Sequence, residues 1–348
     1  MFKNSLKIAA LVSILVLTAC SSDAGSDSSS ENSDAEVTAA ESIVVYSGRN
    51  ETFIKPYFDE FELLTGIKVE ARYGDSAELA AQLLEEGANS PADVFLSQDA
   101  GAIGAVAAAG LLQEIARDRY SAVPNQFTDP NGFWTGITGR ARVVAYDSDL
   151  IDAQDVPTKI DGLLQPQWRG LIGIAPTNAS FQSFVTAMRQ VRGDDATLEW
   201  LKGLAANEPV IFEKNSQMIE ALDAKVIGLS LTNHYYLYEV AESLGKELNV
   251  KNGFFEAGDV GNLLNVSALG ILNTSDKLEA AYALLDYLLS NEAQQRFVTE
   301  TSEYSILPGI NPPGGMPKLE DLGVPDVRLG DLTDIKRTQE LLIEAGLL

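Results

Sequence analysis

Short apolar runs alternate with amphipathic segments from Ser42 onward, and this alternation restricts the fold more than any other feature of the chain. The first unit is expected to hold strands at 43–46, 69–73 and 93–96, and helices at 51–65 and 100–112. Asp75 or Ser76 can cap a further helix between them. The alternation of strands and helices predicts a parallel sheet that is covered on both faces, and hence an α/β fold.

A second unit follows with the same rhythm. Its expected elements are strands at 143–146, 171–175, 210–212 and 226–231, and helices at 180–191, 196–204, 216–223, 277–290, 291–299 and 334–345. The apolar run 263–272 reads as a strand long enough to cross between two domains. The length of 348 residues agrees with about two domains.

Polar side chains gather where the strands of the first unit end. Ligands of parallel sheets bind at the carboxyl ends of the strands. The residues at these ends are Arg49, Asn50 and Glu51, then Gly74 and Asp75, then Gln98 and Asp99.

The N-terminal residues read as an export signal and a tether. Lys3 and Lys7 precede an apolar run too short to span a bilayer, and Leu-Thr-Ala-Cys follows, so residues 1–19 are expected to be a lipoprotein signal peptide. Cys20 would then receive lipid and hold the protein outside the cytoplasm at the cell membrane. A plain secretory signal with an incidental cysteine is the alternative. Residues 20–41, rich in Ser and acidic residues, predict a disordered linker.

Charge and composition exclude several classes of protein. The formal net charge of −25 disfavours nucleic acid and anionic membrane surfaces as partners, which leaves the lipid anchor as the membrane contact. One cysteine and one histidine exclude a disulfide framework and a Cys-based zinc site. No GxSxG, HExxH or P-loop motif occurs, so we do not expect an enzyme.

Several motifs together resemble the ferric-iron-binding lipoproteins and periplasmic proteins of ABC importers. They are YSGRNE at 46–51, TGIKVEARYGDSAELAAQLLEEG at 65–87, SPADVFLSQDAG at 90–101, GRARVVAYDSDL at 139–150, APTNASFQSFVTAMR at 175–189 and TNHYYLY at 232–238. The resemblance implies a two-lobed fold of the periplasmic-binding class (type II), with two parallel-centred sheets and hinge crossovers, that closes over one ferric ion and a small anion. It places lobe 1 at 42–142 and 266–316, and lobe 2 at 143–265 and 317–348. It also implies a monomer that serves an ABC permease and its ATPase.

Tyr235 and Tyr236 are the expected iron ligands. Ferric ion is a hard cation, and a phenolate oxygen is a hard anionic donor once the metal displaces its proton. Both side chains can reach one ion only from a strand end or turn, and the run ending at Asn233 and His234 is such a place. An isolated tyrosine pair would more often be aromatic packing. His234 is expected to pack or to support the ligands.

The first lobe departs from the family pattern. The positions that match the family's histidine and glutamate ligands hold Asn50 and Gln98, which are neutral and better suited to hydrogen-bond water or an anion. Glu51 is the remaining candidate carboxylate. At a helix N-terminus it is equally well explained as an acid that stabilises the helix dipole.

An anion site is expected in the second lobe. Asn178, Ala179 and Ser180 lie between a strand and a helix, where free backbone N–H groups favour an anion, although a plain N-cap gives the same pattern. The resemblance adds Asn215 and Asn233 as contacts of a synergistic carbonate, phosphate or citrate. One of Arg140 and Arg142 is expected to face the cleft and balance the anion, and the other is expected to form an ion pair at the surface. Arg140 is the candidate for the cleft.

The main alternative is a protein of the same fold that binds an anion or a polyamine. Anion binders use helix N-termini and hydroxyl donors, whereas polyamine binders use aromatic cages with paired carboxylates. A visible absorption band on adding ferric ion distinguishes the iron binder from both.

Overall fold

A computed structural model describes residues 42–348 of the chain. The predicted signal peptide, the lipid-modified Cys20 and the linker up to residue 41 lie outside the described residues. Within residues 42–348, no helix combines the length and apolar character needed to cross a membrane.

The first lobe is built on a sheet whose centre is parallel. Strand β1 pairs in parallel with both β2 and β3, and β3 then pairs antiparallel with β9. The elements of this lobe are β1 (Ser42–Ser47), α1 (Glu51–Thr65), β2 (Lys68–Tyr73), α2 (Ser76–Glu86), β3 (Val94–Ser97), α3 (Ala100–Ala108), α8 (Leu278–Leu288), α9 (Asn291–Thr301) and β10 (Tyr304–Ser305).

The second lobe repeats this plan. Strand β5 pairs in parallel with β6 and β7, and β7 pairs antiparallel with β4. The elements of this lobe are β5 (Ile172–Ile174), α4 (Ala179–Arg192), α5 (Asp194–Ala206), β6 (Val210–Ile211), α6 (Asn215–Asp223), β7 (Leu229–Asn233), α7 (Tyr236–Leu244), β8 (Val250–Gly253) and α10 (Ile335–Glu344).

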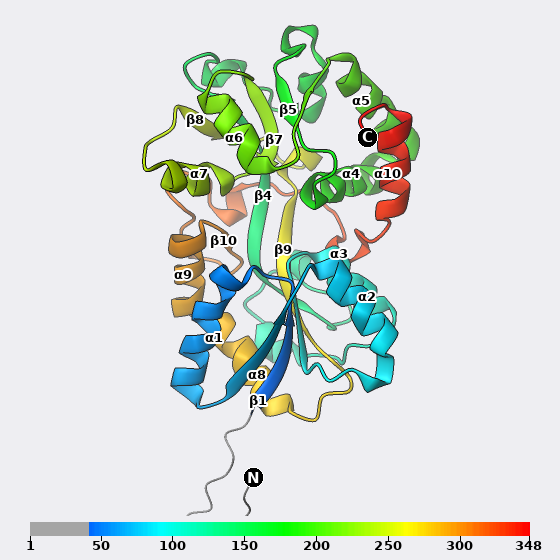
Figure 1. Ribbon diagram of the computed structural model, residues 1–348, viewed down its shortest axis with the longest axis vertical. Helices are drawn as coiled ribbons and strands as arrows, with labels where there is room; N and C mark the ends of the chain where they lie inside the picture. The colour runs from blue at the N-terminus through cyan, green and yellow to red at the C-terminus, as the bar shows by residue number, and fades with distance from the viewer. Residues whose placement is uncertain (1–41) are drawn as a thin grey trace, which may run out of the picture. The chain divides into compact units, whose positions relative to one another are not determined.

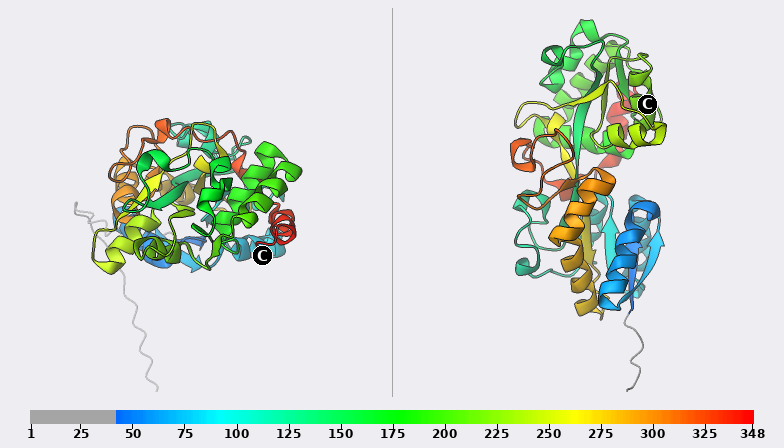
Figure 2. Two further views of the ribbon diagram at one scale, coloured as in Figure 1. Left: turned by 90° about the horizontal axis from the view of Figure 1, so that it is seen from above. Right: turned by 90° about the vertical axis from the view of Figure 1, so that its left-hand side faces the viewer.

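Two long strands, β4 (Thr135–Asp147) and β9 (Leu264–Ile271), belong to both lobes. Along β4 the pairing with β9 ends at Ala141, and the pairing with β7 begins at Arg142. Figures 1 and 2 show both strands running from one group of helices to the other. The strand order β2-β1-β3-β9-β4-β7-β5-β6 confirms the predicted architecture of two parallel-centred sheets.

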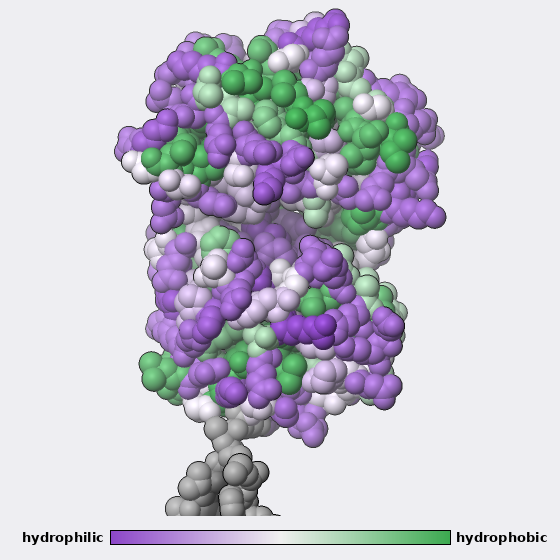
Figure 3. Space-filling view, in the orientation of Figure 1, coloured by the Kyte–Doolittle hydropathy of each residue, from purple (hydrophilic) through white to green (hydrophobic). Residues whose placement is uncertain are grey.

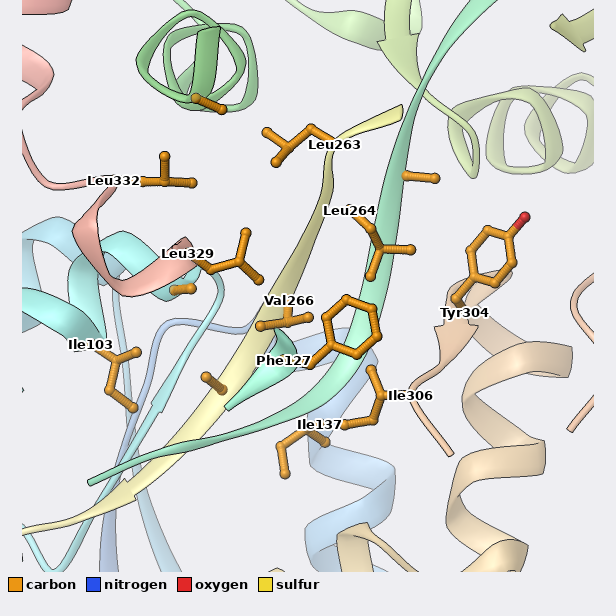
Figure 4. Packing of buried hydrophobic residues seen from close by; sticks show 14 of the residues in the cluster. Ile103, Phe127, Ile137, Leu263, Leu264, Val266, Tyr304, Ile306, Leu329 and Leu332 are labelled. Carbon is orange, nitrogen blue, oxygen red and sulfur yellow. The ribbon is translucent and has the colours of Figure 1, made fainter. Parts of the chain in front are cut away.

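The two crossing strands are packed in apolar side chains. Figure 4 shows Ile137 of β4 and Val266 of β9 near Phe127 and Ile306, and all four are buried. The segment before α10 also contributes, because Leu329 packs on the side of α3. Helix α10 itself packs on α4 and α5. The core is therefore continuous through the crossing.

Local signals explain why the elements begin and end where they do. Helix α1 spans the predicted residues, since Asn50 caps its first turn and Gly66 adopts the left-handed conformation that ends it. Asp75 and Asn178 cap α2 and α4 in the same way. The predicted strand 143–146 is the end of the much longer β4, and α7, β8 and β10 were not predicted.

Candidate functional site

A cavity of about 620 Å³ lies between residues of the two lobes. It is lined by Gly48, Arg49, Asn50, Glu51, Phe53, Tyr73, Gly74, Asp75, Gln98, Tyr235, Tyr236 and Glu239. In Figure 3 the surface is hollowed between the regions of α7 and α2, with mostly hydrophilic residues around the hollow. We call the residues from β1, α1 and β3 the first wall, and those at the start of α7 with the polar groups behind them the second wall.

The tyrosine pair forms the front of the second wall. Strand β7 ends at Asn233, Tyr235 is the N-cap residue of α7, and Tyr236 is its first residue. The two ring centroids lie 4.3 Å apart, and both residues line the cavity. Burial and the neighbouring Tyr236 raise the pKa of Tyr235 well above its ordinary value. Tyr235 therefore holds its proton at neutral pH, and a strongly bound cation can displace it.

His234 supports the tyrosines and does not line the cavity. Its Nδ1 accepts from the backbone N–H of Ala141 at 3.1 Å, and its Nε2 lies 2.8 Å from the carbonyl oxygen of Ser302. Burial lowers the pKa of His234 to about 4, so the ring is neutral, with its proton on Nε2. The expected packing role is confirmed.

An amide and hydroxyl cluster lies behind the tyrosines. The Asn178 side chain accepts from the N–H and the hydroxyl of Ser180 at 3.0 and 2.6 Å, and from Asn215 Nδ2 at 3.1 Å. Asn215 is buried, and its Oδ1 has no partner among the described residues. Ala179 is the first residue of α4, so its backbone N–H belongs to the helix terminus. The structure therefore brings together the polar groups that the sequence assigned to an anion.

Arg142 joins this cluster from β4. Its guanidinium donates to Ser180 Oγ and to Asn233 Oδ1, each at 3.2 Å, and to the carbonyl of Leu231 at 2.8 Å. No carboxylate among residues 42–348 pairs with it. Burial lowers the pKa of Arg142 to about 10, although the two tyrosines oppose this effect. The cluster thus holds a buried cation without a counter-charge.

The expectation of a surface arginine in the GRAR motif was wrong. Both Arg140 and Arg142 are buried, and residues two apart on a strand share a face. They serve different lobes because β4 changes partner between them. Arg140 donates to the carbonyl of Gln98, and its Nε lies 3.9 Å from Glu303. The arginine in contact with the amide cluster is Arg142.

Arg49, which lines the first wall, forms a buried ion pair with Glu303. Arg49 donates to both oxygens of Glu303 at 2.9 and 2.8 Å, and both side chains are buried. Burial alone would raise the pKa of Glu303, but the charge and hydrogen bonds of Arg49 hold it below its ordinary value. This pair was not predicted, because residues 254 positions apart in sequence carry no local signal.

The first wall itself offers neutral groups. Asn50 caps α1, and its oxygen accepts from the N–H and the hydroxyl of Thr52 at 2.9 and 2.8 Å. Gln98 Oε1 is buried without a partner among the described residues and belongs to a cavity-lining residue. Glu51 is the first residue of α1. The pKa of Tyr73 is raised mainly by burial and, to a smaller extent, by the charge of Glu51.

The sequence prediction missed one carboxylate of the cavity, that of Glu239. It lies on α7 one turn after the tyrosines and lines the same space. Glu239 is exposed, and partial desolvation beside the cavity raises its pKa. The spacing of three and four residues from the tyrosines would have revealed it, had helix α7 been predicted.

Other places in the described chain are less suited to a ligand of this kind. No group of three or more His, Cys, Asp or Glu residues within 42–348 is arranged to hold a metal ion, so a metal site here depends on the tyrosines. A larger hollow of about 880 Å³ lies between α3, the loop at 125–133 and the segment 324–333, and no tyrosine lines it.

Comparison with known proteins agrees with this chemistry. Residues 89–320 match the family of bacterial extracellular solute-binding proteins. The Fe(3+)-binding periplasmic protein of Serratia marcescens is 31% identical over 313 residues, which cover 89% of this chain and 92% of that protein. Iron-bound HitA from Pseudomonas aeruginosa has a similar structure, with a TM-score of 0.79, 30% identity and coverage of 88% of this chain and 100% of that one. A Trichodesmium protein, IdiA (FutA), in complex with iron and citrate gives a TM-score of 0.78 at 27% identity, covering 88% and 100%.

Proposed function

Since the chain belongs to the family of bacterial extracellular solute-binding proteins, we propose that it captures ferric ion outside the cytoplasm and passes it to the permease and ATPase of an ABC importer. The pair of adjacent phenols that faces one cavity carries this proposal. The iron is cargo, and we assign no catalysis to the protein.

In the proposed complex, Tyr235 and Tyr236 bind the ion as phenolates. Each phenol gives up its proton when its oxygen coordinates the metal, so two protons leave for each ion bound. The raised pKa of Tyr235 supports strong coupling to pH, because the metal must displace a tightly held proton. Asn50 and Gln98 bind water or anion oxygens, and Glu51 is a candidate carboxylate from the first wall.

A small anion completes the site in this proposal. Ser180 and Asn233 accept from the guanidinium of Arg142, Asn178 and Asn215 bond to Ser180, and the N-terminus of α4 adds Ala179. A buried cation without a counter-ion is costly, and a carbonate, phosphate or citrate oxygen would offset that cost. The anion would then bridge Arg142 and the iron.

The attachment to the membrane is part of the proposal. A lipid on Cys20 would hold the domain at the cell surface. We propose a monomer whose lobe 1 comprises 42–142 and 266–316, and whose lobe 2 comprises 143–265 and 317–348. Closing of these lobes over the ion would present the loaded state to the permease.

Loading with ferric citrate tests the function. Purified residues 21–348 should turn pink to orange through charge transfer from phenolate to iron, with one iron per protein by elemental analysis. A colourless, iron-free protein would contradict the proposal. Phosphate or citrate binding without iron would then favour the anion-binding alternative, which the amide cluster around Arg142 also suits.

A further inference from the structure

We propose that Glu239 is a third anionic iron ligand, supplied by the same helical turn as the two tyrosines. This inference rests on the proposed function and names a carboxylate in addition to Glu51, the candidate from the first wall. It makes the second lobe the source of all three negative protein ligands.

The position of Glu239 suits this role. It follows Tyr235 by four residues and Tyr236 by three, and on a helix such residues have Cβ atoms about 5–6 Å apart. Helical side chains lean toward the N-terminus, so Glu239 lies over the turn that carries the tyrosines. All three line one cavity. Their spacing does not depend on whether the lobes are open or closed.

Glu239 is also free to bind. Within residues 42–348 its carboxylate makes no ion pair and no side-chain hydrogen bond, although its backbone N–H bonds to the carbonyl of Tyr235 at 3.1 Å. By contrast, Asn50 has its oxygen committed to Thr52. Glu51 stands at the N-terminus of α1, where the helix dipole already favours its charge, and it belongs to the other lobe.

The acids near the cavity differ in whether they are already paired. Glu303 pairs with Arg49, while buried Asp99 acts on Arg140 together with Glu303. Glu51 and Asp75 line the cavity from the other lobe. Two phenolates alone leave a ferric ion with one positive charge, and Glu239 is the carboxylate that lies on the same helical turn as the phenolates.

The experiment compares Glu239→Gln with the wild type in ferric titrations at one fixed carbonate concentration. Glu242→Gln is the matched control, since Glu242 is exposed on the same helix and does not line the cavity. We expect Glu239→Gln to lose about 10- to 100-fold in iron affinity. Its charge-transfer band should move to longer wavelength, because iron that loses an anionic donor accepts phenolate electrons more easily. Glu242→Gln should match the wild type in both measurements.

Several results would overturn the assignment. Unchanged affinity in Glu239→Gln would do so, and so would weaker binding with an unmoved band, which indicates a general charge effect. A larger loss in Glu51→Gln would place the carboxylate in the first wall. Equal thermal midpoints of the iron-free proteins exclude misfolding. If the wild type itself binds no iron, the proposed function fails, whatever the variants do.

Discussion

The two walls of the cavity differ in how their charges are paired. In the first wall, Arg49 forms a two-fold hydrogen-bonded pair with Glu303, Asn50 and Gln98 add neutral groups, and Glu51 adds a carboxylate at the start of α1. In the second wall, Arg142 has no carboxylate partner among the described residues, and two phenols face the cavity. The buried arginine of the first wall is therefore neutralised without a ligand, whereas that of the second wall is not.

This difference assigns distinct tasks to the two lobes. The second lobe holds the groups that change protonation or gain a counter-ion on binding, so it should determine affinity. The first lobe should cover the ligand and contribute less to the binding free energy. A ligand held by both lobes stabilises the closed state only by the extra contacts it makes there.

Removing the phenolates should have the largest effect on this comparison. Tyr235→Phe and Tyr236→Phe each delete one anionic oxygen and almost no volume, so folding should persist while iron affinity falls by more than about 100-fold. The charge-transfer band should vanish in the double variant. Titration by visible absorption measures both, and Tyr238→Phe, which keeps the pair intact, is the control. Full binding by the double variant would remove the second wall from the site.

Acid should weaken the connection between the lobes through His234. Its pKa is lowered to about 4 by burial, so below about pH 6.5 the unfolded chain takes up a proton that the folded protein refuses. As the pH drops from about 6.5 to 4, this group alone should lower the free energy of unfolding by about 3 kcal/mol. Urea unfolding at pH 7 and 4.5 measures the loss. The His234→Asn variant should lose less between these two pH values, and an identical loss would contradict the assignment.

Replacing Arg142 should separate anion binding from iron binding. In Arg142→Gln the anion loses its counter-charge, so the gain in iron affinity on adding carbonate should shrink by about 10-fold. Binding in anion-free buffer should change much less. The control is Arg192→Gln. Arg192 does not line the cavity, and its guanidinium donates to Asp161 at 2.6 Å. An undiminished carbonate effect would show that the anion binds elsewhere.

Adding a carboxylate to the first wall should have an effect no larger than that of replacing Arg142. Gln98→Glu restores an acid at the position matched to the family's glutamate, next to a guanidinium that already bonds to its backbone. Iron affinity should rise by about 10-fold, with less dependence on added anion. Competition with a chelator measures the gain, and Gln126→Glu on an exposed loop is the control. A neutral or harmful effect would mean that the first wall takes no part in coordination.

The sequence predicted the elements with clear end signals and missed those without them. Helix α1 was predicted over its exact residues because Asn50 and Gly66 mark its ends. Strand β8, with the sequence VKNG, is short and polar, so no periodicity reveals it. Helix α7 was missed because its first residues were interpreted only as ligands. The structure brings the two tyrosines together, and it brings Asn178 and Asn215 together, while their roles as ligands stay predictions.

The charges of the site were harder to predict than its residue types. The alternation of side chains along a strand predicts the face of the sheet on which each one lies, but it does not predict which other residues bury that face. Arg140 and Arg142 were both buried because β4 is covered along its whole length. The pairing of Arg49 with Glu303 and the free state of Glu239 depend on contacts between distant segments, which only the folded chain defines.

The change of partner along β4 has a mechanical consequence. At Ala141 the strand leaves one ladder for the other, and the N–H of this residue is held by the imidazole of His234 instead of a backbone carbonyl. The same imidazole bonds through Nε2 to the carbonyl of Ser302 at 2.8 Å, so one side chain ties β4 to the segment before β10 at the point where the strand changes partner. Any movement of one sheet relative to the other should therefore strain this pair of bonds, whereas Arg140 and Arg142 stay bonded within their own lobes.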